Sequence, residues 1–161
     1  ITLNSPLPTI TAPLIINGFS QTGATANDLD VGDDASLCVI LESGNASVTR
    51  GLVVPASAGN GTSLFVEGLA FSNFSDAASD LGAGSCHRSG GNRFGGNASG
   101  HALLPNGIGV RLDAAAHDST IGGDDDGACF DVALPPRYVE KTYDRSGSAK
   151  VNFVTNLLPA P

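Results

Sequence analysis

The chain contains no methionine and no tryptophan, and it has little positive charge. Lysine and arginine number 8 together, against 16 aspartates and glutamates, which gives a formal net charge of −8. Binding to a nucleic-acid backbone needs clustered basic side chains that displace counterions, so this composition argues against nucleic acid as a partner. With no tryptophan and only 2 tyrosines, the sequence also offers no clear platform on which sugar rings could stack.

Long apolar runs are missing as well, and cysteine is scarce. No window approaches the roughly 18 to 20 apolar residues of a membrane span, so we expect no membrane insertion. The 3 cysteines, Cys38, Cys86 and Cys129, allow one disulfide and leave one thiol over. Cys86, in a stretch rich in glycine and serine, is the favoured member of such a bridge. The alternative is three buried free thiols.

Turn-forming residues are abundant. The 161 residues include 21 glycines and 9 prolines, and the apolar share of 41% is enough for one globular domain with a real core. No apolar pattern at i, i+3, i+4 is sustained, and Ala77 to Leu81 is the one short helical candidate. The composition and pattern therefore predict an all-β fold.

The stretch GIGVRLDAAAHDSTIGG, residues 107–123, shows the expected structural unit most clearly. It contains a short strand, a polar corner, a second short strand and a double glycine that turns the chain. GNRFGG, centred on Phe94, is a weaker version. Val48, Phe71 and Phe94 recur at intervals of 23 residues, and Ile121 follows after 27. Such periods are typical of stacked coils, in which each coil buries the inner face of its neighbour.

Other segments fit the same plan. Residues 1–18 contain three short β-prone pieces separated by prolines, which belong at strand starts and corners. Residues 63–74 form the longest β-favouring run, and their apolar side chains on both faces suit buried strands. Residues 75–100, rich in glycine, serine, alanine and aspartate, are predicted to be a loop around one short strand at Phe94.

These segments resemble the coils of the right-handed parallel β-helix repeat proteins, the pectate-lyase-like fold of bacterial secreted and surface proteins. The matching segments are ITLNSPLPTITAPLIING, LFVEGLAFSNF, GNRFGG and GIGVRLDAAAHDSTIGG. The resemblance implies a right-handed parallel β-helix, or solenoid, over residues 1–129. It also implies a secreted protein, extracellular or at a cell surface. Ser119 stands where that family often has asparagine, so we expect no stacked asparagine ladder there.

The C-terminal segment, residues 130–161, differs in character. It holds both tyrosines, both lysines and two strand-like runs, RYVEKTY and AKVNFVTNLL. This pattern predicts a β-hairpin that caps the coils, or a strand donated to a sheet edge of another subunit. Open edges are templates for pairing, and a head-to-tail contact that does not close builds a fibre. We therefore expect the chain to be its own partner, by end stacking or strand addition.

Candidates for catalysis are few. Arg111 and Asp113 would share the outward face of one strand, and His117 would follow at the corner. The resemblance implies polysaccharide cleavage as an activity, and an outward group of this kind could perform acid–base chemistry. A surface ion pair beside a loop histidine is the commoner arrangement. The sequence therefore favours a protein that is not an enzyme.

Two further kinds of site are predicted from loops. Four aspartates between two strand-like segments could share a Ca²⁺ ion, the only cofactor that the sequence suggests, or could form a solvated acidic loop. They are Asp28, Asp30, Asp33 and Asp34. Four N-x-S/T sequons would be surface acceptors in a glycosylating secretory pathway, and are otherwise ordinary turn residues. Their asparagines are Asn45, Asn60, Asn73 and Asn97.

These observations predict a secreted, non-enzymatic structural or adhesive module that assembles end to end into an extracellular filament. The alternative is a polysaccharide lyase, a hydrolase or a carbohydrate-binding fragment that uses Arg111, Asp113 and His117. A bland outer face of serine, threonine, alanine and asparagine favours the first hypothesis. A groove lined by arginine, aspartate and aromatic side chains would favour the second. The readable outward positions are mostly bland.

Overall fold

The computed structural model of the chain describes residues 1–28, 34–99, 102–122 and the strand at 131–132. The fold is all-β, as predicted, and every paired strand is parallel to its neighbours. The one helix in these ranges is a three-residue 3-10 helix, η1 (Gly18–Ser20). None of the described residues belongs to a helix with the length and apolarity needed to cross a membrane.

The strands form three parallel sheets. The first sheet has the order β1 (Thr2–Leu3), β3 (Val39–Ser43), β6 (Leu69–Ser72), β9 (Arg93–Phe94) and β12 (Asp131–Val132). The second sheet has the order β4 (Leu52–Val54), β7 (Ala77–Ser85) and β10 (Ile108–His117). The third sheet has the order β2 (Leu14–Asn17), β5 (Leu64–Glu67), β8 (Arg88–Gly90) and β11 (Thr120–Ile121).

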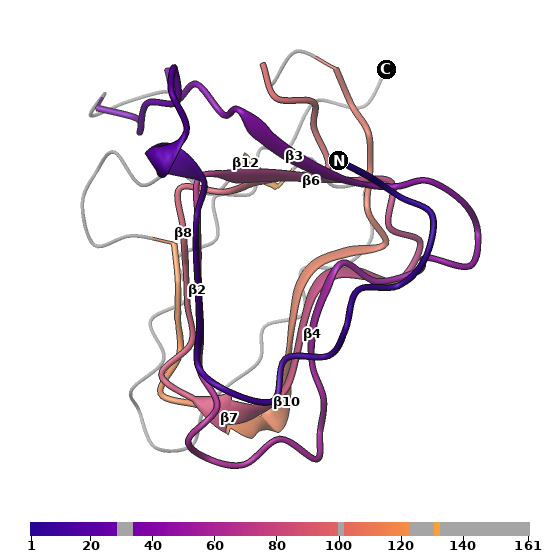
Figure 1. Cartoon of the computed structure of the whole chain (residues 1–161), viewed down its shortest axis with the longest axis vertical. Coiled ribbons are helices and arrows are strands. Elements are labelled where there is room, and N and C mark those ends of the chain that lie inside the picture. The colour runs from indigo at the N-terminus through magenta and orange to yellow at the C-terminus, as the bar shows by residue number, and fades with distance from the viewer. Residues whose placement is uncertain (29–33, 100–101, 123–130, 133–161) are drawn as a thin grey trace, which may run out of the picture.

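The chain visits the three sheets in a fixed order, and we call one passage through all three a circuit. β3, β4 and β5 form one circuit, β6, β7 and β8 the next, and β9, β10 and β11 the one after that. In the first circuit, β1 and β2 are joined by a segment without a strand, whose Ile10 N–H donates to the Val53 carbonyl of β4 at 2.8 Å. The circuits outline a three-sided frame (Figure 1).

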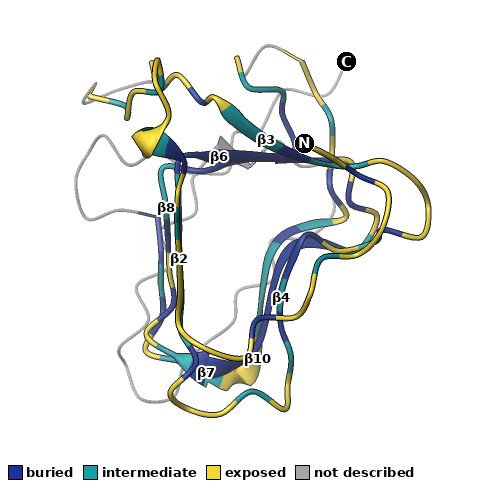
Figure 2. Cartoon of the chain, viewed as in Figure 1, coloured by how far each residue is buried: buried dark blue, intermediate teal, exposed yellow. Residues whose placement is uncertain are grey.

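Inward side chains fill this frame, and the strands of the middle circuits are the most deeply buried (Figure 2). Leu41, Phe71 and Phe94 lie in register on three neighbouring strands of the first sheet, and all three are buried. The rings of Phe71 and Phe94 stack with their centroids 4.8 Å apart and an interplanar angle of 4°. Burying a side chain of this size contributes about 2 to 3 kcal/mol relative to leaving it exposed.

The predicted interval of 23 residues is confirmed for one pair and wrong for the others. Phe71 and Phe94 are register partners, but the partner of Phe71 on the preceding circuit is Leu41. Val48 is buried in the corner that follows β3, and Ile121 lies in the third sheet, on β11. The circuits differ in length because loops of different size are placed at the corners between sheets.

The region 75–100 is mostly strand, and the prediction of a loop there is wrong. β7, β8 and β9 pass through it, and the helical candidate, Ala77 to Leu81, belongs to β7. This strand lies between β4 and β10 in the second sheet, and all of its residues except Ser85 are buried. Alanine, serine and glycine are weak strand formers alone, so pairing on both sides must hold them extended.

Two other predicted segments have the expected character. Residues 107–123 contain β10, a corner at Asp118 and Ser119, and then β11. Residues 63–74 contain β5 and β6, which belong to different sheets because the chain turns at Gly68, where φ is +71°. Only the backbone of β12 is described from the predicted C-terminal segment 130–161, and it adds to the first sheet parallel to β9. The cap or donated strand predicted for this segment lies outside the described residues.

We expect Gly68→Ala to lower the free energy of unfolding by about 1 to 3 kcal/mol, as measured by urea denaturation. L side chains rarely adopt its positive φ, and an added Cβ would lie 2.7 Å from the backbone nitrogen of Phe19. Gly59→Ala is the matched control, because nothing lies within 4 Å of its added Cβ. Equal effects of the two substitutions would show that this corner does not require glycine.

Candidate functional site

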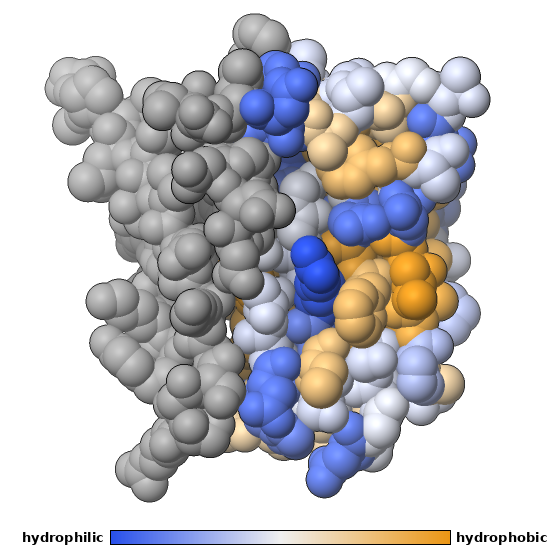
Figure 3. All heavy atoms as spheres, turned by 90° about the vertical axis from the view of Figure 1, so that its left-hand side faces the viewer, coloured by the Kyte–Doolittle hydropathy of each residue, from blue (hydrophilic) through white to orange (hydrophobic). Residues whose placement is uncertain are grey.

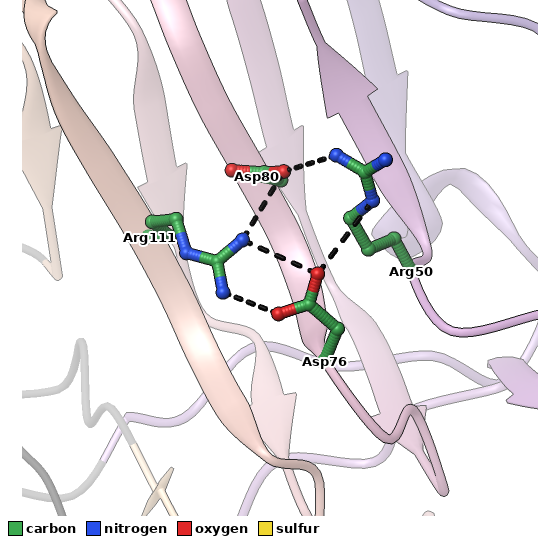
Figure 4. Close-up of polar contacts among 4 residues, drawn as sticks. All are labelled: Arg50, Asp76, Asp80 and Arg111. Carbon is green, nitrogen blue, oxygen red and sulfur yellow. Dashed lines mark hydrogen bonds and ion pairs between the residues drawn. The ribbon is translucent and has the colours of Figure 1, made fainter.

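Four charged side chains meet on the outer face of the second sheet, and we call them the charge quartet (Figure 4). Arg50 precedes β4, Asp76 precedes β7, Asp80 lies on β7 and Arg111 lies on β10. Register brings them together, since Arg111 is the partner of Asp80 across the β7–β10 pair. The quartet therefore spans three successive circuits.

Each carboxylate of the quartet lies between two guanidinium groups. Asp80 Oδ2 is 2.7 Å from Arg50 Nη1 and 3.4 Å from Arg111 Nη1. Asp76 Oδ2 is 3.7 Å from Arg50 Nε and accepts a hydrogen bond of 3.3 Å from Arg111 Nη1. Arg111 Nη2 donates to Asp76 Oδ1 as well, so this contact is bidentate. Two positive and two negative charges cancel within the cluster.

The pairing fixes the charge of the groups that form it. The hydrogen bond from Arg111 holds the pKa of Asp76 below its ordinary value, although partial burial acts in the opposite direction. The same bond raises the pKa of Arg111 above its ordinary value. A general acid or base works best when its pKa lies near the operating pH, and both shifts lead away from neutrality. The quartet is therefore suited to joining circuits and poorly suited to proton transfer.

The three catalytic candidates do not form one group. Arg111 and Asp113 lie two residues apart on β10, but Arg111 is engaged by the quartet. His117 lies six residues beyond Arg111, about 20 Å away at the rise of an extended strand. There its Nδ1 is 2.9 Å from Asp118 Oδ2. Arg111 is thus part of a surface ion-pair cluster, and its partners are Asp76 and Asp80.

We expect Arg111→Ala to lower the free energy of unfolding by about 1 kcal/mol, because it removes ion pairs that are only partly exposed. A double-mutant cycle with Asp76→Asn, followed by urea denaturation, isolates the coupling between the two groups. Asp113→Asn is the control on the same strand, since Asp113 is exposed. Its effect should stay within about 0.5 kcal/mol. Strictly additive effects of Arg111→Ala and Asp76→Asn would show that the quartet does not couple the circuits.

Buried asparagines satisfy the backbone at two of the three corners. Asn92, between the third and first sheets, accepts a hydrogen bond from the Leu69 N–H at 3.0 Å and donates to the Val66 carbonyl at 2.8 Å. Both groups lie at the equivalent corner one turn earlier, where β5 is followed by β6. Asn106, between the first and second sheets, forms the same pair of bonds at 3.0 Å each. Buried backbone groups at a corner have no ladder partner, so these side chains supply one.

His87 has the equivalent place at the third corner, between the second and third sheets. It is 1% exposed, and its Nδ1 accepts a hydrogen bond from the Leu64 N–H at 3.0 Å. Nε2 therefore carries the proton and donates to the Ala83 carbonyl at 2.9 Å. Burial lowers the pKa of His87, the bond to Ala83 opposes this, and the nearby His117 adds to the lowering. His87 is a neutral structural residue.

We expect folding stability to decrease below about pH 6.5 because of His87. The pKa of His87 is lowered in the folded state, so the unfolded chain takes up the proton first. The contribution of neutral His87 is fully present above its ordinary pKa of 6.5 and is lost as the pH falls toward the folded-state pKa. The slope is at most about 1.4 kcal/mol per pH unit. Urea denaturation between about pH 7.5 and pH 5 measures it.

Two histidine variants separate this effect from other titrations. His87→Asn puts at this corner the residue type that the other two corners use, and it should abolish the slope. His117→Asn changes a partly exposed imidazole and should keep most of the slope, because burial is the largest cause of the lowered pKa of His87. A slope that survives in His87→Asn would assign the pH dependence to other groups.

The acidic loop is described only at its two ends. The Asp28 N–H donates to Asp34 Oδ1 at 3.1 Å, and the Asp34 N–H donates to Asn27 Oδ1 at 3.0 Å. Asp30 and Asp33 lie outside the described residues. In the ranges that are described, no three histidine, cysteine, aspartate or glutamate side chains gather as a metal site would require. The calcium site stays a prediction.

Cys38 and Cys86 are free thiols, and both are exposed. The alternative of three buried thiols is therefore wrong for these two, and no bridge joins them. Both lie outside the strands: Cys38 precedes β3, and Cys86 forms the corner between β7 and β8 with φ of +58°. Cys129 lies outside the described residues.

The four sequons lie between strands, as surface acceptors would. Asn45, Asn60 and Asn73 are exposed, and Asn97 is half-buried. The side-chain amides of Asn45 and Asn73 already donate hydrogen bonds, of 2.9 and 2.8 Å. Glycosylation at these positions stays a prediction.

Comparison with known proteins returns no match among protein-family models, curated proteins or solved structures. The role of the residues is therefore inferred from their geometry. The sequence patterns missed Arg50, Asp76 and Asp80, each of which is isolated in its own segment. They missed the corner roles of His87 and Asn92 as well. A shared signal exists: His87 directly precedes β8, and Asn92 directly precedes β9.

Proposed function

We propose that this protein is a secreted structural or adhesive module, a right-handed parallel β-helix that assembles end to end into an extracellular filament. The observation that carries the proposal is the fixed order in which the chain visits three parallel sheets. Repetition of that order leaves each circuit in contact mainly with the circuits before and after it, as in other solenoids. The right hand is supported by the strong preference of crossovers between parallel strands.

The polar groups of the described circuits support a structural role. Asn92 and Asn106 bond to the backbone of the preceding circuit, and so does His87. The charge quartet joins three circuits across the outer face of the second sheet. In both cases polar side chains are engaged in holding neighbouring circuits together.

The extracellular or cell-surface location is proposed from the resemblance of the coil segments to secreted β-helix proteins. The exposed sequon asparagines Asn45, Asn60 and Asn73 are compatible with a surface that carries glycans. Assembly is proposed because, among the residues that the structure describes, each sheet ends in a strand with no neighbour on one side, and such edges template pairing with another chain.

The assembly state of the purified chain tests this proposal. Electron microscopy and light scattering are expected to show filaments for the full chain, and a variant without residues 148–161 shows whether that segment takes part. Filaments that disappear with the segment would indicate a donated strand, and filaments that persist would indicate end stacking. A stable monomer in both forms would overturn the proposal. The chain would then be tested against acidic polysaccharides with calcium, with Arg111 and Asp113 substituted.

A further inference from the structure

Three asparagines of the chain are followed directly by glycine, and the fold gives them very different surroundings. They are Asn17, Asn60 and Asn106. An asparagine can lose its side-chain amide as ammonia when the backbone nitrogen of the next residue attacks its Cγ. Glycine in that next position favours the attack, because it has no Cβ to block the approach. The three pairs are equal candidates for deamidation by sequence, so their surroundings must distinguish them.

Asn106 is held in the buried corner between the first and second sheets. It is 4% exposed, and its side-chain amide accepts from the Phe74 N–H and donates to the Phe71 carbonyl, at 3.0 Å each. The nitrogen that would attack is engaged as well, since the Gly107 N–H donates to the Phe74 carbonyl at 2.8 Å. Both reacting groups of this pair are bonded and shielded from water, so the fold protects it.

Asn17 is exposed, but its side chain is already engaged. Its Oδ1 accepts a hydrogen bond of 3.2 Å from the Ser20 N–H and thereby caps η1. Gly18 is buried, and a Cβ built on it would collide with the Gly68 carbonyl oxygen. The reaction would break the cap and disturb this close contact, so we expect it to be slow.

Asn60 differs from both. Asn60 and Gly61 are the central residues of a turn, which the Thr62 N–H closes by donating to the Gly59 carbonyl at 2.9 Å. Asn60 is exposed, and within the described ranges no hydrogen bond engages its side-chain amide or the Gly61 N–H. A Cβ built on Gly59 or Gly61 meets nothing within 4 Å. The reacting groups of this pair are therefore unrestrained by neighbours.

Water, the other reactant, has access to this turn. In the space-filling view of the third sheet, apolar side chains gather on the face of the sheet (Figure 3). The lower rim in that view, on the side of the corner with the second sheet, is mostly hydrophilic or neutral. The turn that contains Asn60 joins β4 of the second sheet to β5 of the third, so it lies at this rim.

We propose that Asn60 is a site of spontaneous deamidation in the folded protein. The Gly61 nitrogen loses its proton to solvent base and forms a bond to Asn60 Cγ, and the bond from Cγ to the side-chain nitrogen breaks, which releases ammonia and leaves a succinimide. Water then opens the succinimide at either carbonyl and gives aspartate or isoaspartate. One water is consumed for each ammonia released, and nothing is oxidised or reduced. The reaction needs only the folded chain and water, so it goes beyond the proposed function and does not depend on it.

The position of the turn gives this reaction a structural effect. The Asn60 carbonyl accepts a hydrogen bond of 2.6 Å from Ser85 Oγ, and the Thr62 carbonyl accepts one of 3.0 Å from the Ser85 N–H. Ser85 ends β7, in the next circuit. Isoaspartate routes the main chain through the former side chain, so the former backbone carbonyl becomes a carboxylate outside the main chain. Deamidation therefore displaces these two contacts and weakens the link between circuits at this corner.

Asn60 is also one of the four predicted glycan acceptors, in the sequon Asn60-Gly61-Thr62. A glycan would be attached to the side-chain nitrogen that deamidation releases. Deamidation in turn removes that nitrogen and ends the sequon. The two modifications therefore compete for the same atom, and a host without N-glycosylation supplies protein in which this amide is unmodified.

Peptide mapping by mass spectrometry tests the proposal. The full chain from such a host is incubated in mildly alkaline buffer, with and without denaturing guanidinium, and conversion of each asparagine is followed over time. In the folded chain, Asn60 is expected to convert several-fold faster than Asn17 and Asn106. In guanidinium, where the three pairs lose their surroundings, the rates should become similar. A folded-state rate at Asn60 no higher than that at Asn106 would overturn the proposal.

Gly61→Ala is the matched control. Its Cβ meets nothing within 4 Å, and the φ of Gly61 is not in the left-handed region, so the variant should fold. The added Cβ hinders attack by the nitrogen of residue 61, so conversion of Asn60 should fall several-fold while the sequon is kept. Equal conversion in this variant and the unaltered chain would assign the loss of ammonia to direct hydrolysis and overturn the proposal.

The structural effect has its own measurement. Unaltered protein in which Asn60 has converted should unfold at a lower guanidinium concentration than fresh protein, whereas Gly61→Ala incubated in the same way should keep its midpoint. An unchanged midpoint after conversion of Asn60 would show that Ser85 does not depend on this turn, and would overturn the proposed link between deamidation and the corner.

Discussion

Pairing between strands one circuit apart is the interaction on which the rest of this structure depends. Within the described part of the chain, no strand pairs with the strand next to it in the sequence, because consecutive strands lie in different sheets. A single circuit therefore has neither a hydrogen-bonding partner nor a covered inner face. Phe71 is buried because Phe94 and Leu41 lie on either side of it, one circuit away in each direction. Stability arises from the stack, since no circuit could supply it alone.

Corners are the weak point of such an arrangement, and polar side chains are concentrated there. The backbone leaves one sheet and enters the next, so its buried N–H and C=O groups lose their ladder partners. His87, Asn92 and Asn106 replace those partners from the following circuit. The charge quartet on the outer face of the second sheet links three successive circuits. In a fold that is held by hydrogen bonds along the stack, these side chains extend the same bonding pattern to places where the backbone cannot continue it.

The sequence predicted the strand and corner units but not how they align. Residues 107–123 were recognisable because two strands and their corner lie in one short segment. The pairing of Phe71 with Phe94 was recognisable because the circuit that separates them, formed by β6, β7 and β8, is short. The pairing of Leu41 with Phe71 was not, since longer segments after β3 and after β4 lengthen the circuit that separates them. β7 was missed because its small side chains have low strand propensity, and the charge quartet because register is a non-local property.

The unequal circuits have a consequence for how the chain folds. Register partners are separated by 23 residues between Phe71 and Phe94 and by 30 between Leu41 and Phe71. The entropic cost of closing a loop grows slowly, by about 0.6 kcal/mol of free energy for each doubling of the loop's length. Each new circuit therefore meets a barrier of similar height to the last, whatever the length of its corner loops. Such a chain can order progressively while it is still being synthesised, with each completed circuit serving as the template for the next.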